Sequence, residues 1–92
     1  MPTLFSIGSY KIYFWSNEGN PLEPVHVHVA VKTPSQNATK IWLTEAGGAL
    51  LCHNNSKIPQ KDLSKIMDVV QAMHTVVVDQ WRDYFGAVSY YC

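Results

Sequence analysis

Two histidines, His26 and His28, stand two residues apart in the run 25–29, and imidazole is the side chain that titrates closest to neutral pH. If this run is a strand, both rings project from the same face, with their Cα atoms about 6.5–7 Å apart. Two imidazoles so placed can share a metal ion, or act as a base and an acid on one substrate. The same spacing is typical of histidines with a structural role, so all three interpretations stay open.

A metal centre would need more ligands than this pair, because a catalytic zinc ion takes three from the protein. No spacing pattern joins the pair to the other residues of suitable type, and we therefore expect no bound metal and no cofactor. Those residues are Glu18, Cys52, His53 and His74. The sequence also contains no phosphate-binding loop, nucleophile elbow or dinucleotide fingerprint, which leaves open whether the chain is an enzyme.

The histidine pair lies in the most regular of several predicted strands. Residues 25–31 place a valine at every second position, which is typical of a strand with one buried face. The other predicted strands cover residues 4–7, 10–15, 39–44 and, with a weaker pattern, 50–53. Gly8 and Ser9 fit a type II′ hairpin turn between the first two strands, because glycine readily adopts a positive φ.

From residue 60 onward, apolar residues recur every three or four positions, which predicts one long helix over 60–85. This helix would be about 39 Å long at 1.5 Å per residue. Pro59 suits its first turn and Gly86 its C-terminal cap. The sequence therefore predicts one α+β domain over 1–92, with a four- or five-stranded, mostly antiparallel sheet over about 3–54. The helix packs on one face of this sheet, and a short tail follows at 87–92.

Alternation assigns the strand residues to two faces, of which a single helix can cover only one. The core expected under the helix consists of Leu4, Ile12, Phe14, Val25, Val27, Val29, Ile41, Leu43, Leu63, Ile66, Val70, Met73, Val77 and Trp81. The opposite face, called the second face below, carries Lys11, Tyr13, Trp15, His26, His28, Lys32, Lys40 and Trp42. It combines large aromatic rings with lysines and histidines, and is the most informative surface that the sequence predicts.

The second face admits three interpretations. Its rings can pack as cross-strand pairs on a half-exposed surface. They can form a homodimer or partner interface, because large exposed aromatic patches usually mark one. They can stack the bases of a single-stranded nucleic acid while lysines neutralise phosphates. Seven Lys plus Arg balance seven Asp plus Glu, and this zero net charge disfavours the last interpretation.

Cysteine content and hydropathy indicate the compartment. The chain has only two cysteines, Cys52 and Cys92, and no basic, apolar leader precedes the first strand. No segment approaches the roughly 20 apolar residues of a membrane span. We therefore expect free thiols, a cytoplasmic location and no membrane partner.

Several segments together carry a family resemblance. They are residues 1–3, 10–20 with the Ser16-Asn17-Glu18-Gly19 turn, 24–29 with the histidine pair, 40–43, and 81 with 85–86. In these segments the chain resembles a family of small prokaryotic proteins, the domain of unknown function 4160. Val25 stands where the family usually has a second proline, Ile58 stands where a serine usually caps the helix, and the tail lies outside the pattern. The resemblance implies a bacterial protein without an established activity, often paired with another small domain in a toxin–antitoxin-like pair.

These observations predict a small binding module that engages a protein partner through the second face. The candidate binding residues are Lys11, Tyr13, Trp15, Glu18, Lys40 and Trp42. We expect a homodimer, because exposed aromatics without net charge favour self-association, and a small protein encoded nearby is a further candidate partner. The alternative is a small hydrolase or nuclease that uses His26 and His28, with or without a metal ion.

Overall fold

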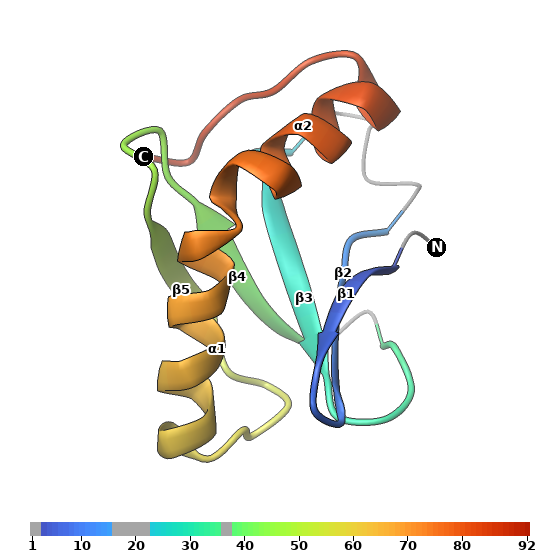
Figure 1. Ribbon diagram of the computed structural model, residues 1–92, viewed down its shortest axis with the longest axis vertical. Helices are drawn as coiled ribbons and strands as arrows, with labels where there is room; N and C mark the ends of the chain where they lie inside the picture. Colours follow the sequence, from blue (N-terminus) through green and yellow to red (C-terminus); the bar gives the residue numbers. More distant parts are fainter. Residues whose placement is uncertain (1–2, 16–22, 36–37) are drawn as a thin grey trace.

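The computed structural model describes residues 3–15, 23–35 and 38–92 of the 92-residue chain. Five strands precede two helices (Figure 1). Their bounds are β1 Thr3–Ile7, β2 Tyr10–Tyr13, β3 His26–Ala30, β4 Thr39–Leu43, β5 Ala49–His53, α1 Gln60–Ala72 and α2 His74–Phe85. The strands form one sheet in the order β1-β2-β3-β4-β5, and each neighbouring pair is antiparallel. The predicted α+β class and the antiparallel sheet are thereby confirmed.

The turn between β1 and β2 forms where the sequence predicts it. Ile7 and Tyr10 are cross-strand partners, so Gly8 and Ser9 are the two central residues of the turn. Gly8 has φ of 58°, the positive value that the first central position of a type II′ turn requires. The tight turn places Tyr10 at the start of β2, close to the first turns of α1.

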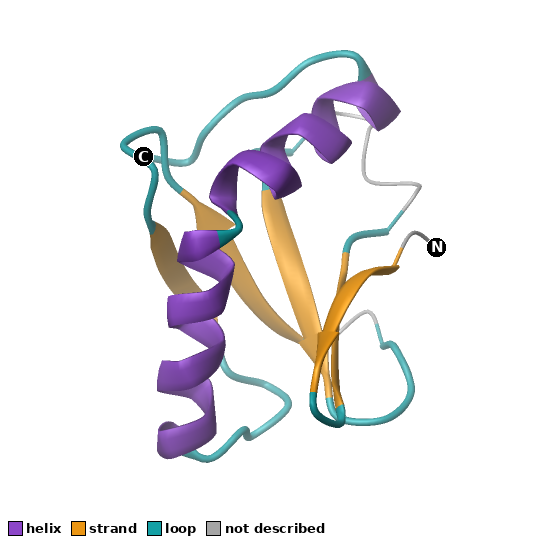
Figure 2. Cartoon of the chain, viewed as in Figure 1, coloured by secondary structure: helices purple, strands orange, loops and turns teal. Residues whose placement is uncertain are grey.

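The pairing register confirms the assignment of strand residues to two faces. Val27 lies opposite Ile41, and Ile12 lies opposite Val29. These residues share one core cluster with the helices, and their side of the sheet is called the helix face below. The helices contribute Leu63, Ile66, Val70, Val77, Val78 and Trp81 to this cluster. In Figure 2, viewed as in Figure 1, α1 lies in front of the β4 and β5 side of the sheet and α2 crosses the upper end of β3. Two predicted core residues, Leu4 and Met73, are only partly buried at its margin.

The prediction of one continuous helix over 60–85 is wrong. The helix breaks at Met73, which has φ of −95° and ψ of 12°, and α2 continues in a new direction (Figure 1). A straight helix of about 39 Å would exceed the longest dimension of the molecule, 33 Å. The bend therefore keeps both helices over the sheet, and it carries α2 across the end of β3. Gly86 ends α2 in a left-handed conformation, as predicted.

The segment after α2 returns across the end of the sheet to the turn between β4 and β5 (Figure 1). The backbone N–H of Val25 donates to the carbonyl of Ser89, and that of Glu45 donates to the carbonyl of Cys92, each at 2.9 Å. Val88 packs against the main core. Within the described ranges, neither helix is long and apolar enough to cross a membrane.

Candidate functional site

The sheet register brings most of the predicted site residues together on the second face. Tyr13 lies opposite His28, His28 opposite Lys40, and Lys40 opposite His53, which makes one row across β2 to β5. A neighbouring row contains His26, Trp42 and Leu50. Trp15 joins the first row through an edge-to-face contact with Tyr13, at 5.4 Å between ring centroids. Lys11 lies exposed on the same face, and Glu18 lies outside the described residues.

The expectation that this face is an exposed aromatic patch is wrong for its β2–β3 half. Tyr13 and His26 are completely buried, and His28 keeps only 5% of its surface exposed. Tyr13 also belongs to a small core of its own with Ala30 and Ala38. We call Tyr13, His26 and His28 the covered half of the second face.

Ser35 and Ala38, which lie between β3 and β4, cover Tyr13 and His28. The Tyr13 hydroxyl donates to the carbonyl of Ser35 at 2.9 Å and accepts the Ser35 backbone N–H at 3.0 Å. His28 Nδ1 lies 3.3 Å from the carbonyl of Ala38. These contacts replace solvent over Tyr13 and His28 with backbone, so the Tyr13 hydroxyl and His28 Nδ1 have hydrogen-bond partners inside the fold.

His26 also departs from the expectation that both histidines lie away from the helices. Its ring contacts Trp81 of α2 at 5.2 Å between centroids, as well as Trp42 at 5.6 Å and His28 at 5.1 Å. The cause is the bend at Met73, because α2 crosses the end of β3 where the two faces meet. Trp81 there contacts Phe14 of the helix face and His26 of the second face.

Backbone carbonyls orient both imidazoles. His26 Nδ1 lies 2.9 Å from the carbonyl of Pro24, and His28 Nδ1 makes the contact with Ala38 described above. A carbonyl only accepts, so each Nδ1 carries the hydrogen and donates it. This arrangement holds the rings in fixed orientations, which suits structural residues. Among the described residues, no group of three His, Cys, Asp or Glu side chains is placed to hold a metal ion.

The β4–β5 half of the second face is different, and we call it the open half. It consists of Lys40, Trp42, Leu50, His53 and Tyr91. Tyr91 stacks on Trp42 with centroids 4.8 Å apart and an interplanar angle of 5°, yet keeps 61% of its surface exposed. Lys40 lies with its Nζ 4.3 Å from the centre of the Trp42 ring and 3.1 Å from the Glu23 carboxylate.

His53 is the titratable group of the open half with a shifted pKa. Burial lowers the pKa of His53 below its ordinary value, and electrostatic interactions with His28 and Lys40 lower it further. The neutral form is therefore favoured in the folded protein. In this form the ring accepts the backbone N–H of Asn55 on its Nδ1, at 3.4 Å.

β5 forms the edge of the sheet beside the open half. Its sequence, Ala-Leu-Leu-Cys-His, contains no Lys, Arg, Asp, Glu or Pro. Leu50 and Leu51 keep 43% and 38% of their surfaces exposed. Natural sheets usually protect an edge strand with charges, proline or a cover, because its unpaired backbone groups can bind another strand. β5 is thus an apolar edge next to a half-exposed aromatic pair.

Sequence reasoning missed Leu50 and Tyr91 as members of this surface. Leu50 lies in the predicted strand with the weakest pattern, 50–53. The sequence therefore did not show which residue of β4 lies opposite it. Tyr91 lies in the tail, where no periodicity indicates that the chain returns to the sheet. His53 was among the possible metal ligands, but its place opposite Lys40 depends on the register shift between β4 and β5.

A family model described as domain of unknown function (DUF4160) matches residues 9–82. The match includes the histidine pair and both helices up to Arg82, and it leaves out the tail that carries Tyr91. Comparisons with curated proteins and with solved structures found no match.

Proposed function

We propose that this chain, which belongs to the family of the domain of unknown function DUF4160, is a binding module whose protein partner docks on the open half of the second face and on β5. The observation that carries the proposal is the uncharged edge strand with two exposed leucines. An extended partner segment would add to β5 through main-chain hydrogen bonds, and its side chains would contact Leu50, Trp42 and Tyr91.

The open half supplies the features that a protein interface uses. Leu50 and Tyr91 offer apolar surface, and tyrosine and tryptophan are enriched where binding energy concentrates. The ion pair between Lys40 and Glu23 lies beside them, and Glu23, with 44% of its side chain exposed, can stay hydrated at the rim. A small protein encoded nearby, as in a toxin–antitoxin-like pair, is the partner that the family resemblance suggests, and a second copy of the chain is the other.

Two earlier interpretations lose their support. A nucleic-acid site on the open half would need an unstacked ring and an unpaired lysine there, whereas Trp42 already stacks on Tyr91 and Lys40 is paired with Glu23. A hydrolase or nuclease would need imidazoles that reach its substrate, whereas His26 and His28 are buried. We therefore favour the binding module and do not propose the enzyme.

The test uses one charged substitution on the edge and a matched one elsewhere. Leu50→Lys and Leu51→Lys place a charge on β5, and Val76→Lys places one at a residue of α2 with 41% exposure. A partner would bury the exposed 43% of Leu50 and 38% of Leu51, and a lysine at either position would also bring a charge into the interface. Each β5 variant should therefore weaken partner binding by roughly tenfold. Val76→Lys should leave binding unchanged.

Binding is measured in two ways with the same variants. Analytical ultracentrifugation over micromolar concentrations reports self-association, and quantitative pull-down from extract of the source cells reports a different protein. A partner that is lost equally with Leu50→Lys and Val76→Lys, or retained with both, would contradict the proposal. So would a chain that stays monomeric and retains no protein from the extract.

A further inference from the structure

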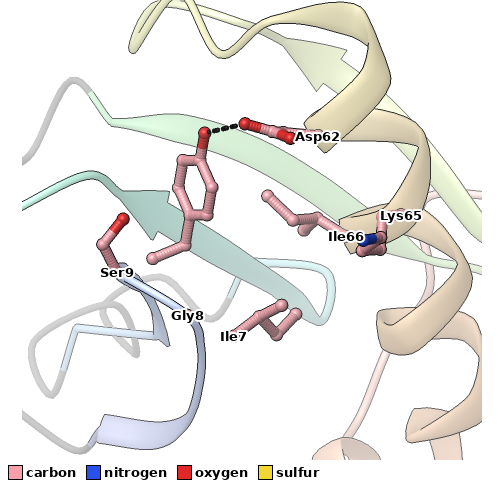
Figure 3. Close-up of a pocket in the computed structure, with 7 residues that line it drawn as sticks. Ile7, Gly8, Ser9, Asp62, Lys65 and Ile66 are labelled. Carbon is pink, nitrogen blue, oxygen red and sulfur yellow. Dashed lines mark hydrogen bonds between the residues drawn. The ribbon is translucent and has the colours of Figure 1, made fainter.

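A second polar region lies on the helix face, away from the open half. It is a pocket of about 300 Å³ between the β1–β2 turn and the first turns of α1 (Figure 3). This volume is at the lower end of the range of small-molecule sites, about 300–1,000 Å³. Its walls include a tyrosine, a carboxylate, an ammonium group and two isoleucines. The pocket therefore has both polar groups and apolar surface within reach of one small ligand.

The carboxylate belongs to Asp62 in the first turn of α1. The Tyr10 hydroxyl donates to its Oδ2 at 2.7 Å, shown as the dashed line in Figure 3. That hydrogen bond raises the pKa of Tyr10, and burial and the charge of Asp62 raise it further. The phenol thus stays protonated as a donor near neutral pH. It orients Asp62 at the pocket, and Oδ1 of this carboxylate has no hydrogen-bond partner among the described residues.

The ammonium group belongs to Lys65, three residues after Asp62 on the same side of α1. Within the described part of the chain Lys65 forms no ion pair, although Asp62 lies only one turn away. The pocket consequently has a carboxylate and an ammonium group that do not neutralise each other by direct contact. Ile7 of the turn and Ile66 of α1 line it as apolar surface (Figure 3).

We infer that this pocket binds a small zwitterion with a short apolar side chain, which is the chemistry of a free aliphatic α-amino acid. Its ammonium group would bind Asp62, its carboxylate would bind Lys65, and its side chain would lie between Ile7 and Ile66. Charge-assisted hydrogen bonds are the stronger kind, so two of them on opposite charges select a zwitterion over a singly charged molecule. The inference does not depend on the proposed partner site.

Three related probes test the charge requirement by ¹⁵N NMR titration of the whole chain. L-Leucine carries both charges, 4-methylpentanoate lacks the ammonium group, and 3-methylbutylamine lacks the carboxylate. Leucine should give saturable shifts at the amides of Ile7, Ser9 and Ile66. Each singly charged probe should bind roughly tenfold more weakly, because it loses one charge-assisted hydrogen bond.

Variants assign each charge to its residue. Lys65→Met removes the group that binds the carboxylate, so this variant should bind leucine no better than the unchanged chain binds 3-methylbutylamine. Asp62→Asn removes the group that binds the ammonium, so this variant should bind leucine no better than the unchanged chain binds 4-methylpentanoate. Lys61→Met is the control, since Lys61 is exposed on α1 and does not line the pocket. The spectrum of each variant reports whether its fold is retained.

The absence of saturable shifts with leucine would overturn the inference. Equal affinity for all three probes would overturn it as well, because the pocket would then not distinguish charge. The Leu50→Lys variant should bind leucine with unchanged affinity, because Leu50 does not line the pocket. The proposal for the partner site and the inference for this pocket can therefore be contradicted separately.

Discussion

The two halves of the second face have similar residue types but differ in solvent exposure. Tyr13 and His28 are buried under Ser35 and Ala38, and His26 is buried against Trp81 of α2. Trp42 and Tyr91, in contrast, remain partly exposed beside the edge strand β5. Both halves contain aromatic rings and histidine on alternating strand positions, and the open half adds Leu50 of β5 and Tyr91 of the tail. The difference is therefore due to what lies over each half. Aromatic and histidine residues on a sheet face indicate a binding surface only where the chain itself does not cover them.

The largest change in the free energy of unfolding is expected for substitutions in the covered half. Tyr13→Ala removes a fully buried ring and the bonds to Ser35, and should reduce the free energy of unfolding by about 3–5 kcal/mol. Lys11→Ala, on the same strand but exposed, should change it by less than about 0.5 kcal/mol. Urea denaturation measures both. Similar small effects for the two variants would mean that the ring of Tyr13 is not part of a core.

A smaller change separates the ring of Tyr13 from its hydroxyl. Tyr13→Phe keeps the ring and removes the two hydrogen bonds to Ser35, with an expected cost of about 1 kcal/mol. The Ser35 amide should then exchange its hydrogen faster, which NMR hydrogen exchange detects. Unchanged exchange at Ser35 would show that this hydroxyl does not hold the β3–β4 connection in place.

The open half should contribute a pH dependence through His53. Because its pKa is lower in the folded protein, the unfolded chain binds more protons between the two pKa values. Stability should therefore be complete above the unfolded pKa of about 6.5 and fall as the pH decreases through this value toward the folded pKa.

Thermal unfolding between pH 5 and 8 measures the effect as a slope of stability against pH. His53→Gln should reduce this slope, and Lys40→Gln should reduce it in part because it removes one of the charges that lower the pKa. A slope that His53→Gln leaves unchanged would assign the dependence to other groups.

The smallest effect on stability is expected at the edge. Leu50→Lys replaces a residue with 43% exposure and should change the free energy of unfolding by no more than about 0.5 kcal/mol. Chemical denaturation of this variant thus controls the binding test, because lost binding then reflects the surface and not the fold. A large loss of stability would instead make Leu50 a core residue.

Much of the fold follows from local patterns in the sequence. The valines of 25–31 determine which residues share a face, and Gly8 and Gly86 occupy the positive φ values that their positions predict. The bend at Met73 has no such signal, because neither glycine nor proline marks it. A straight helix over 60–85 would exceed the 33 Å length of the molecule, which is a property that no local pattern shows.

The residues that β2, β3 and β4 contribute to the candidate site were predictable, but their exposure was not, and neither were Leu50 and Tyr91. Alternation places Tyr13, His26, His28 and Trp42 on one face, and the register confirms it. Burial of Tyr13 and His28 depends on Ser35 and Ala38, which lie in a segment without periodicity. Burial of His26 depends on Trp81 of α2. Alternation along a strand determines the face to which each side chain points. Whether another segment of the chain then buries that side chain depends on the tertiary structure.

The most direct test of the division into halves compares the histidines within one molecule. Diethyl pyrocarbonate modifies accessible imidazoles, and peptide mass spectrometry gives the rate at each site, normalised to the rate in the unfolded chain. Since His26 and His28 are buried and His53 lies in the open half, we expect rapid modification of His53. His26 and His28 should stay protected until the protein unfolds. Modification of all three at the same normalised rate in the native protein would contradict the division of the second face.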